Sequence, residues 1–208
     1  MTFENLQNLI SQGEGKLLDF KFAVNDTRKI AVAICAFANT DGGTLLIGVK
    51  DNGKIAGVNA QEEYFMIETA AQMRCRPQIN FYTSTIDTPS GTVLKVDIPE
   101  GKSKPYAAQD ATGNYKVYVR VNDENVLCDR VTRVSLKNCR SNKGVRIKYS
   151  QKEDFVLKFL AEKGAVSVND VIEYLDIDKF DAENILIGLM SSKIIKTDYL
   201  GRFTMNDK

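Results

Sequence analysis

The stretch AFANTDGGTLLIGVKDNGKIAG, residues 36–57, decides the fold. It begins inside a segment, residues 28–39, whose apolar residues recur at helical spacing, so we predict a helix there. Residues 41–43 predict a turn, because glycine adopts positive φ without a steric penalty. Residues 44–49 are nearly all apolar, which predicts a strand in the middle of a sheet.

Further elements extend on both sides of this stretch. The run Asp51-Asn52-Gly53 predicts a hairpin turn, with residues 55–58 as the returning strand. Upstream, we predict a helix over residues 2–10 and a strand over residues 17–22. Downstream, the pattern predicts one helix and three strands, at residues 61–73, 79–86, 92–98 and 115–121. Helices mixed with hairpins in this order indicate an α+β fold with a mixed sheet.

The last part of the chain predicts a second, smaller domain. Residues 151–162 and 168–175 have helical patterns, and a third helix starts at Asp178 or Asp181 and runs to about Lys193. A short hairpin follows, and helix-turn-helix plus hairpin is the layout of a winged helix. We therefore predict a first domain, a basic linker and a winged-helix-like domain, at residues 1–140, 141–150 and 151–208.

Composition excludes several classes of site. The chain has 208 residues and no histidine, which rules out Ser-His-Asp triads, histidine general bases and zinc sites of the Cys/His type. The four cysteines form no CxxC pair, and Cys35, in an apolar run, is expected to be a buried thiol. We expect a reducing, cytoplasmic location without disulfides. No signal peptide and no apolar run near 18 residues is visible, so no membrane association is expected.

Charge is distributed unevenly along a chain whose net charge is only +1. Residues 1–129 and residues 151–208 each carry a net charge of −3, whereas residues 130–150 hold seven basic residues and no acidic one. This basic belt consists of Arg130, Arg133, Lys137, Arg140, Lys143, Arg146 and Lys148. Clustered Lys and Arg side chains are typical of surfaces that bind phosphate backbones. The alternative is a solvated linker or helix face without a ligand.

Several motifs together carry a family resemblance. They are Gly13-Glu14, Leu18-Asp19-Phe20-Lys21, the stretch 36–57, Lys104-Pro105-Tyr106 and Tyr118-Val119-Arg120-Val121. With these motifs, residues 10–130 resemble the Schlafen AlbA_2 domain, also called divergent AAA, whose pattern is GES…EFK followed by AFANTxGGxLxIGVxDxGxIxG. The sequence departs from that pattern at Gly15, where the family has Ser, and at Asp19, where it has Glu. The resemblance implies an AlbA_2-like fold and nucleic-acid binding, with DNA favoured over RNA, in a transcriptional-regulator role.

The resemblance also implies a candidate catalytic and metal site. Schlafen proteins that cleave tRNA use three acidic residues, and the matching positions here are Glu14, Asp19 and Asp51. Three converging carboxylates would hold Mg²⁺ or Mn²⁺, since hard cations prefer oxygen ligands, and the metal would activate water against a phosphate. A metal-dependent ribonuclease is therefore the alternative function, although the shorter side chain at position 19 weakens it. The competing interpretation is that Asp51 serves its turn and that the other two carboxylates face solvent.

The motif residues Asn39, Asp41, Gly42, Gly43 and Gly48 have two interpretations. The first four suit a tight turn or the close approach of a backbone, whereas a glycine inside a strand, as at position 48, indicates that another backbone or a ligand comes near. For the glycines, shaping the turn and contacting a ligand are equally good interpretations, whereas a capping role is favoured for Asn39. Because no GxxxxGK[ST] phosphate loop occurs, ATP binding is only a further alternative.

The third helix of the small domain is very apolar. After acidic residues near its start, it contains Ile185, Leu186, Ile187, Leu189 and Met190. This composition favours dimerisation over sequence-specific readout, and a homodimer would suit a palindromic site. A protein-interaction module that oligomerises is therefore the third class of function.

Overall fold

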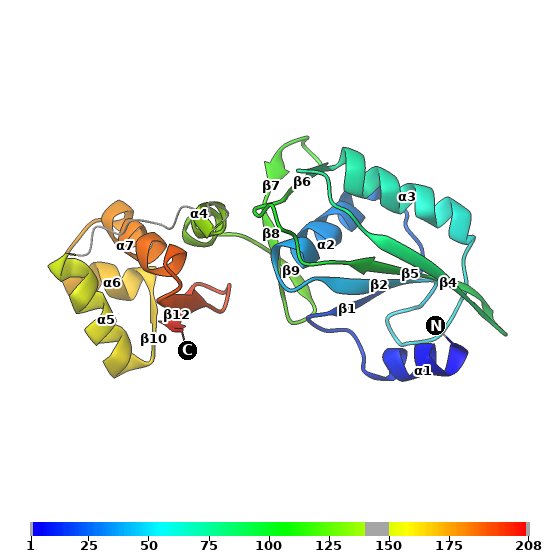
Figure 1. Ribbon diagram of the computed structural model, residues 1–208, viewed down its shortest axis with the longest axis horizontal. Coiled ribbons are helices and arrows are strands. Elements are labelled where there is room, and N and C mark those ends of the chain that lie inside the picture. The colour runs from blue at the N-terminus through cyan, green and yellow to red at the C-terminus, as the bar shows by residue number, and fades with distance from the viewer. Residues whose placement is uncertain (1, 140–149, 207–208) are drawn as a thin grey trace. The chain divides into compact units, whose positions relative to one another are not determined.

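The computed structural model describes residues 2–139 and 150–206 (Figure 1). The chain forms two compact units, Met1–Leu127 and Cys128–Lys208. The division lies upstream of the predicted linker, so the helix at residues 130–139 belongs to the second unit, although the sequence placed it in the first domain. The reason is its apolar face, because Val131 is buried in the hydrophobic core of the second unit. Residues 141–149 of the predicted linker lie outside the described residues.

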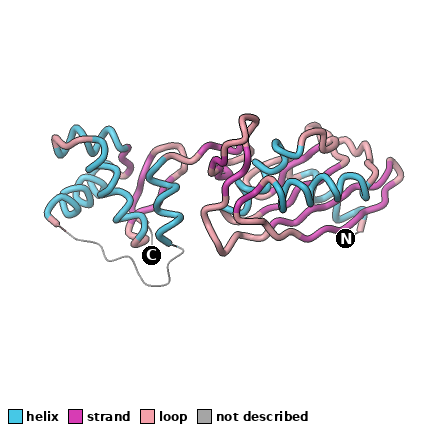
Figure 2. Tube along the Cα trace, turned by 90° about the horizontal axis from the view of Figure 1, so that it is seen from above, coloured by secondary structure: helices cyan, strands magenta, loops and turns pink. Residues whose placement is uncertain are grey.

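A four-stranded mixed sheet forms the centre of the first unit (Figures 1 and 2). Its order is β1-β2-β5-β4, with β1 parallel to β2 and the other two pairs antiparallel. The strands are β1 (Leu18–Lys21), β2 (Gly43–Ile47), β4 (Tyr82–Thr88) and β5 (Gly91–Ile98). The predicted α+β class, the mixed sheet and the interior position of β2 are confirmed.

The hairpin predicted after β2 is reduced to a turn. Val49 and Ile55 form one isolated antiparallel bridge, and residues 55–58 do not continue as a strand. The sheet gives the reason, because β1 and β5 already occupy both edges of β2. The chain bends back at once, and the Gly48 carbonyl accepts hydrogen bonds from the amides of Ala56 and Gly57 at 2.8 and 3.1 Å.

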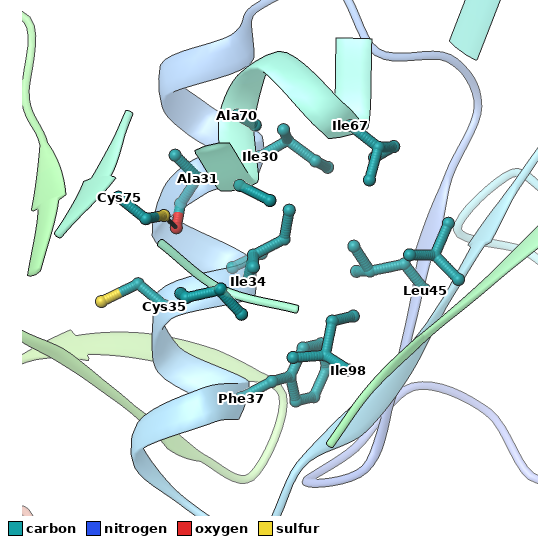
Figure 3. Close-up of a cluster of buried hydrophobic side chains, with 14 of the residues drawn as sticks. Ile30, Ala31, Ile34, Cys35, Phe37, Leu45, Ile67, Ala70, Cys75 and Ile98 are labelled. Carbon is teal, nitrogen blue, oxygen red and sulfur yellow. Dashed lines mark hydrogen bonds between the residues drawn. The ribbon is translucent and has the colours of Figure 1, made fainter. Parts of the chain in front are cut away.

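Helices cover both faces of the sheet. The helices of this unit are α1 (Phe3–Ser11), α2 (Thr27–Asn39) and α3 (Ala60–Met73). One face packs under α2 and α3, where Ile34, Phe37 and Leu45 are fully buried (Figure 3). The other face packs under α1, through Leu6 and Leu46. Truncating a buried aromatic such as Phe37 to Ala typically costs about 3–5 kcal/mol of unfolding free energy. The two layers of helices pack on the two faces of the sheet and hold β1 and β2 in position.

Two smaller sheets flank α2 and α3. The first contains β3 (Cys75–Arg76), β6 (Ala107–Gln109) and β7 (Tyr115–Lys116), in the order β3-β6-β7. The second is the hairpin of β8 (Tyr118–Val121) and β9 (Glu124–Leu127). The single strand predicted over residues 115–121 is therefore divided at Val117, and its halves join different sheets.

The second unit has the element order expected for a winged helix. Its elements are α4 (Arg130–Cys139), α5 (Gln151–Lys163), β10 (Ala165–Ser167), α6 (Val168–Leu175), α7 (Lys179–Ser191), β11 (Ile195–Thr197) and β12 (Arg202–Met205). The three strands form an antiparallel sheet in the order β10-β12-β11. Ser150 and Ser167 each begin a helix with a capping box, which fixes where α5 and α6 start. None of the helices in the described ranges is long and apolar enough to cross a membrane.

The apolar residues of α7 form the core of this unit. Leu186 and Leu189 are fully buried, and Ile185 and Ile187 are nearly so. They pack with residues of α4, α5 and β12 in one cluster. The prediction that these side chains provide a dimer contact is therefore wrong, because they are buried in the core of the unit itself.

Candidate functional site

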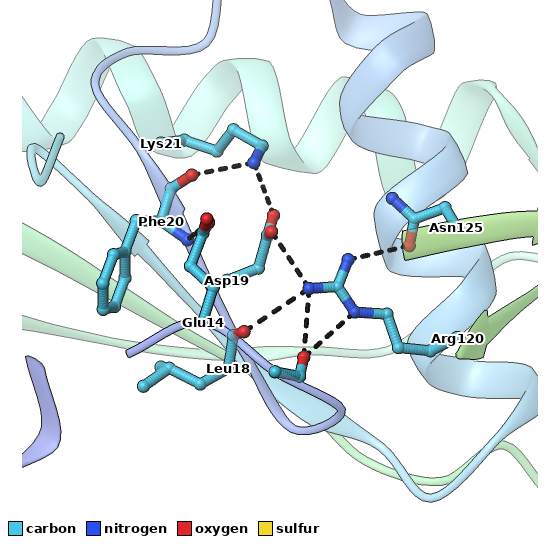
Figure 4. A network of polar contacts seen from close by, with 8 residues as sticks. Glu14, Leu18, Asp19, Phe20, Lys21, Arg120 and Asn125 are labelled. Atoms are coloured by element: carbon cyan, nitrogen blue, oxygen red, sulfur yellow. Dashed lines mark hydrogen bonds and ion pairs between the residues drawn. The ribbon is translucent and has the colours of Figure 1, made fainter. Parts of the chain in front are cut away.

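Asp19 and Arg120 form a buried ion pair beside the first strand (Figure 4). Asp19 lies on β1 and Arg120 on β8, and their side chains are 5% and 1% exposed. Arg120 Nη2 donates to Asp19 Oδ1 at 3.1 Å. Charges buried to this degree are tolerated only when they are paired and hydrogen-bonded, so the two side chains depend on each other.

Arg120 connects three segments of the first unit. Its Nε and Nη2 donate to the Gly15 carbonyl at 3.2 and 3.1 Å, and Nη2 also lies 3.4 Å from the Leu18 carbonyl. Its Nη1 donates to Asn125 Oδ1 at 3.1 Å. The guanidinium also lies over the Phe37 ring, 5.0 Å from its centroid. One side chain thus ties the loop before β1 to the β8–β9 hairpin and to α2.

Lys21 and Glu14 complete the cluster of charges. Lys21 Nζ lies 2.6 Å from Asp19 Oδ2 and donates to the Phe20 carbonyl at 2.7 Å. Glu14 Oε1 accepts a hydrogen bond from the Phe20 amide at 2.7 Å. Burial, and then the neighbouring Asp19 charge, raise the pKa of Glu14, against the lowering effect of the Phe20 hydrogen bond. Glu14 and Asp19 are therefore neighbours, as the motif alignment requires.

Asp51 does not join them in a metal-binding group. It is exposed at the turn that follows β2, where the neighbouring Asn52 side chain accepts from the Lys54 amide at 3.0 Å. Among the described residues, no three His, Cys, Asp or Glu side chains are arranged to hold a metal ion. The Asp19 carboxylate is also engaged by two cations, Arg120 and Lys21, one on each oxygen. This donor set does not fit Mg²⁺ or Mn²⁺, and no catalytic step through a metal follows from it.

Asn39 has a structural role that differs from a helix cap. It is fully buried at the end of α2. Its Nδ2 donates to the carbonyls of Tyr106 and Tyr118 at 2.9 and 2.8 Å, and its Oδ1 accepts from the Tyr106 amide at 2.8 Å. The side chain thus holds the segment before β6 and the start of β8 against α2.

The glycines of the motif shape the path from α2 into β2. Gly42 has φ +77°, and a Cβ there would lie 2.7 Å from the Ile98 carbonyl oxygen. A Cβ at Gly43 would lie 2.3 Å from the Phe37 ring. A Cβ at Gly48, which has φ +99°, would meet the backbone of Thr92 and Gly57. Close protein packing accounts for all three glycines, whereas Asp41 lies on the surface in an ion pair with Lys16 at 2.5 Å.

The basic belt divides into a described and an undescribed part. Arg130, Arg133 and Lys137 lie on α4, whereas Arg140, Lys143, Arg146 and Lys148 lie outside the described residues. Arg133 and Lys137 are exposed, one turn apart on the helix. Arg130 instead pairs with Glu183 at 2.7 Å, donates to Asn184 at 3.1 Å and lies over the Phe180 ring.

Helix α4 runs alongside α7 within the second unit. Its first residue, Arg130, contacts Glu183 and Asn184, and Asn138 near its end donates to Ser191 Oγ at 3.1 Å. The two helices are therefore parallel, and the buried face of α4 consists of Val131, Thr132 and Ser135. Because α4 covers one side of α7 and Asp181 lies in the first turn of α7, this helix is a poor candidate for reading bases.

Sequence reasoning missed Arg120 as a site residue. The available signal was the arginine itself, which stands between two valines in an otherwise apolar strand-like run. A charge on the buried face of a strand requires a partner of opposite sign, and Asp19, in the strand predicted over residues 17–22, was a candidate. Their sequence separation of 101 residues hid the pairing.

The fold and the cluster together define a class of protein. It is an α+β domain whose mixed sheet carries a buried Asp–Arg pair at β1, joined to a small unit of helices with a three-stranded sheet. The family model for the Schlafen, AlbA_2 domain matches residues 14–129, more than half of the chain. The chain belongs to the Schlafen AlbA_2 family.

Solved structures with some similarity include two bacterial proteins. The N-terminal domain of a RecG-related protein from Nitrosomonas europaea has 19% sequence identity and a TM-score of 0.44, over 58% of this chain and 88% of that domain. The DIP2311 protein from Corynebacterium diphtheriae has 18% identity and a TM-score of 0.47, over 92% of this chain and 34% of its own. No curated protein gives a significant match.

Proposed function

We propose that this protein is a cytoplasmic nucleic-acid-binding protein that binds duplex DNA in the role of a transcriptional regulator. The observation that carries the proposal is the exposed face of α4. This helix buries one side within its own unit and presents Arg133 and Lys137 outward, in a segment without acidic residues. Such a face attracts phosphates without reading sequence. Membership of the AlbA_2 family supports the same class of function.

Sequence preference has to arise from another part of the protein. Helix α7 has an acidic first turn and is partly covered by α4, so direct readout through α7 is not favoured. A homodimer remains part of the proposal, because two α4 faces would suit a palindromic site. Its contact surface would have to lie outside the apolar residues of α7, which are buried.

The test is a fluorescence-anisotropy titration of labelled duplex DNA and structured RNA at low and near-physiological salt. We expect R133E/K137E to weaken duplex binding at least tenfold and to lower the log–log salt slope by about 2, because two phosphates are no longer neutralised. The control is K29E/K54E, which reverses two exposed lysines of the first unit and leaves α4 intact. Equal affinity for both double variants would contradict the proposal.

The same samples separate the alternatives. Each titration is repeated with Mn²⁺ and checked on a gel, because a ribonuclease would cleave the RNA and lose cleavage with Asp51→Ala. A DNA-binding regulator keeps its affinity in that variant. Light scattering on each sample gives the oligomeric state. A stable oligomer without nucleic-acid binding would instead support an interaction module.

A further inference from the structure

A second cationic and aromatic surface lies in the first unit and shares no residue with the basic belt. Arg76 on β3 lies over the ring of Tyr115 on β7, with the guanidinium carbon 5.3 Å from the ring centroid. Both side chains are exposed. A guanidinium held against a ring keeps its outer edge available to an anion, and the contact reduces its conformational freedom.

The turn between β6 and β7 holds Tyr115 in place. Asp110 Oδ1 accepts hydrogen bonds from the amides of Thr112 and Asn114 at 2.9 and 3.0 Å. Its other oxygen pairs with Lys116 Nζ at 2.9 Å. Lys116, Thr112 and these backbone amides hold the pKa of Asp110 far below its usual range. The turn that leads into Tyr115 is therefore held by its own hydrogen bonds and by the Asp110–Lys116 ion pair.

A groove adjoins this pair. Pro77, which lines the groove, follows Arg76 directly, and Tyr106, which also lines it, precedes Ala107, the register partner of Arg76. The volume of the groove is about 510 Å³, within the range of small-ligand sites. We name it the lateral groove, with Gln78, Ile79, Tyr82, Pro99, Lys102 and Tyr106 among its lining residues.

The chemistry of the lateral groove suits a nucleotide. Tyr82 is 69% exposed and offers a ring against which a base can stack. Ile79, Pro99 and Tyr106 provide apolar lining, and Gln78 provides an amide.

The charges around the groove leave two cations uncompensated. Glu100, the acidic residue of the lining, pairs with Lys104 at 2.7 Å, and Asp110 pairs with Lys116. Within the described residues, neither Lys102 nor Arg76 has a carboxylate at ion-pair distance. A phosphate is therefore the complementary group.

We propose that the lateral groove, with Arg76 held by Tyr115, binds an unpaired nucleotide of a single-stranded nucleic acid. The base stacks on Tyr82, and Lys102 and Arg76 contact the backbone phosphates. A duplex does not fit this description, because its bases are stacked on each other and present no free face. The inference rests on the proposed function and extends it, since it assigns the first unit a contact that differs from α4 in position and in preferred strand state.

The test uses the full chain with single-stranded DNA and RNA oligonucleotides that carry one 5-iodouracil. We expect Y82A/K102A to weaken single-strand binding about tenfold and to leave duplex affinity unchanged, with a salt slope lower by about 0.7 because one phosphate is no longer neutralised. The control F65A/K54A also removes one exposed aromatic ring and one exposed lysine, neither of which lines the groove. Circular dichroism verifies that both variants are folded.

Photocrosslinking gives a second, independent readout. Irradiation is expected to link the iodouracil to the peptide that contains Tyr82, and comparison of the two oligonucleotides shows whether DNA or RNA is preferred. Equal single-strand affinities for Y82A/K102A and its control, a crosslink confined to other peptides, or no single-strand binding by the wild type would each overturn the inference.

The outcomes separate this inference from the proposed function. If R133E/K137E loses duplex binding while Y82A/K102A keeps its single-strand affinity, the groove is ruled out as a binding site and the proposed function is supported. If Y82A/K102A loses single-strand affinity while R133E/K137E keeps its duplex affinity, the groove is supported as a binding site and the assignment of duplex binding to α4 is ruled out.

Discussion

Arg120 is a positive charge inside a folded core, and its surroundings explain how that is possible. Its guanidinium donates to four acceptor groups, the carbonyls of Gly15 and Leu18 and the side chains of Asp19 and Asn125. Each of the three guanidinium nitrogens thus has at least one oxygen acceptor, as the burial of a charge requires. The family pattern has Glu where this chain has Asp19, and the pairing with Arg120 shows how the shorter carboxylate is used here.

Removal of Arg120 alone is expected to be costly. Arg120→Met leaves the Asp19 carboxylate buried with only Lys21 beside it and leaves the Gly15 carbonyl without its donor, so we expect a loss of about 3 kcal/mol in unfolding free energy. The double variant D19N/R120M should recover part of this loss, because no unpaired buried charge remains. Urea denaturation of the two single variants and the double variant measures the coupling, and strictly additive effects would contradict a paired role.

Glu14 is expected to make stability depend on pH. Its pKa is raised in the folded protein by burial and by Asp19, so the folded state binds its proton more tightly than the unfolded state does. This contribution to stability is present at low pH and is lost as pH rises through the raised pKa. Glu14→Gln keeps an acceptor for the Phe20 amide and removes the charge.

At pH 7 we therefore expect Glu14→Gln to be slightly more stable than the wild type, by less than about 1 kcal/mol because the group is only half-buried. The advantage should shrink as the pH is lowered from 7 and Glu14 takes up its proton, which its raised pKa makes easier in the folded state. Thermal unfolding across this pH range checks the sign. An advantage that grows as pH falls would show that Glu14 is stabilised as the anion.

At the level of elements, the connection between α2 and β2 sets the position of the cluster. Gly42 combines a positive φ with a backbone approach from Ile98, so Gly42→Ala should cost about 2 kcal/mol or more. Gly15→Ala is the matched control, because a Cβ there meets nothing within 4 Å and no positive φ is required. We expect that variant to stay within about 0.5 kcal/mol of the wild type. Chemical denaturation compares the two, and equal losses would contradict the packing role of Gly42.

The sequence predicted elements well where local signals agree and poorly where neighbours decide. The α2 helix, the turn and β2 follow from periodicity, glycines and an apolar run, and all three are present. Residues 55–58 have a good hairpin signal, but the edges of β2 were already taken, which no local pattern reveals. The Asp19–Arg120 pair and the Asn39 contacts join residues far apart in sequence, so their geometry could not be derived from spacing.

For the whole molecule, the sequence alone revealed the cluster of basic residues at 130–150, but it did not reveal which of these side chains are used inside a folded unit. Residues 130–150 are basic in any conformation, and this was visible at once. Only packing shows that Arg130 is used inside the second unit, by Glu183 and Asn184, and that Arg133 and Lys137 remain exposed. The contribution of α4 to the proposed phosphate binding is therefore expected to be smaller than the number of basic residues indicates, and the salt slope is the measurement that reports it.

The sheet order has a consequence for hydrogen exchange. β2 lies between β1 and β5, so its amides are protected on both sides, whereas β4 lies at an edge and alternate amides of an edge strand face outward. The amides of β2 should exchange with solvent deuterium only when the whole first unit opens, and half of those in β4 much sooner. The exchange lifetime of the β2 amides thus reports the stability of the first unit by itself, separately from the stability of the second unit.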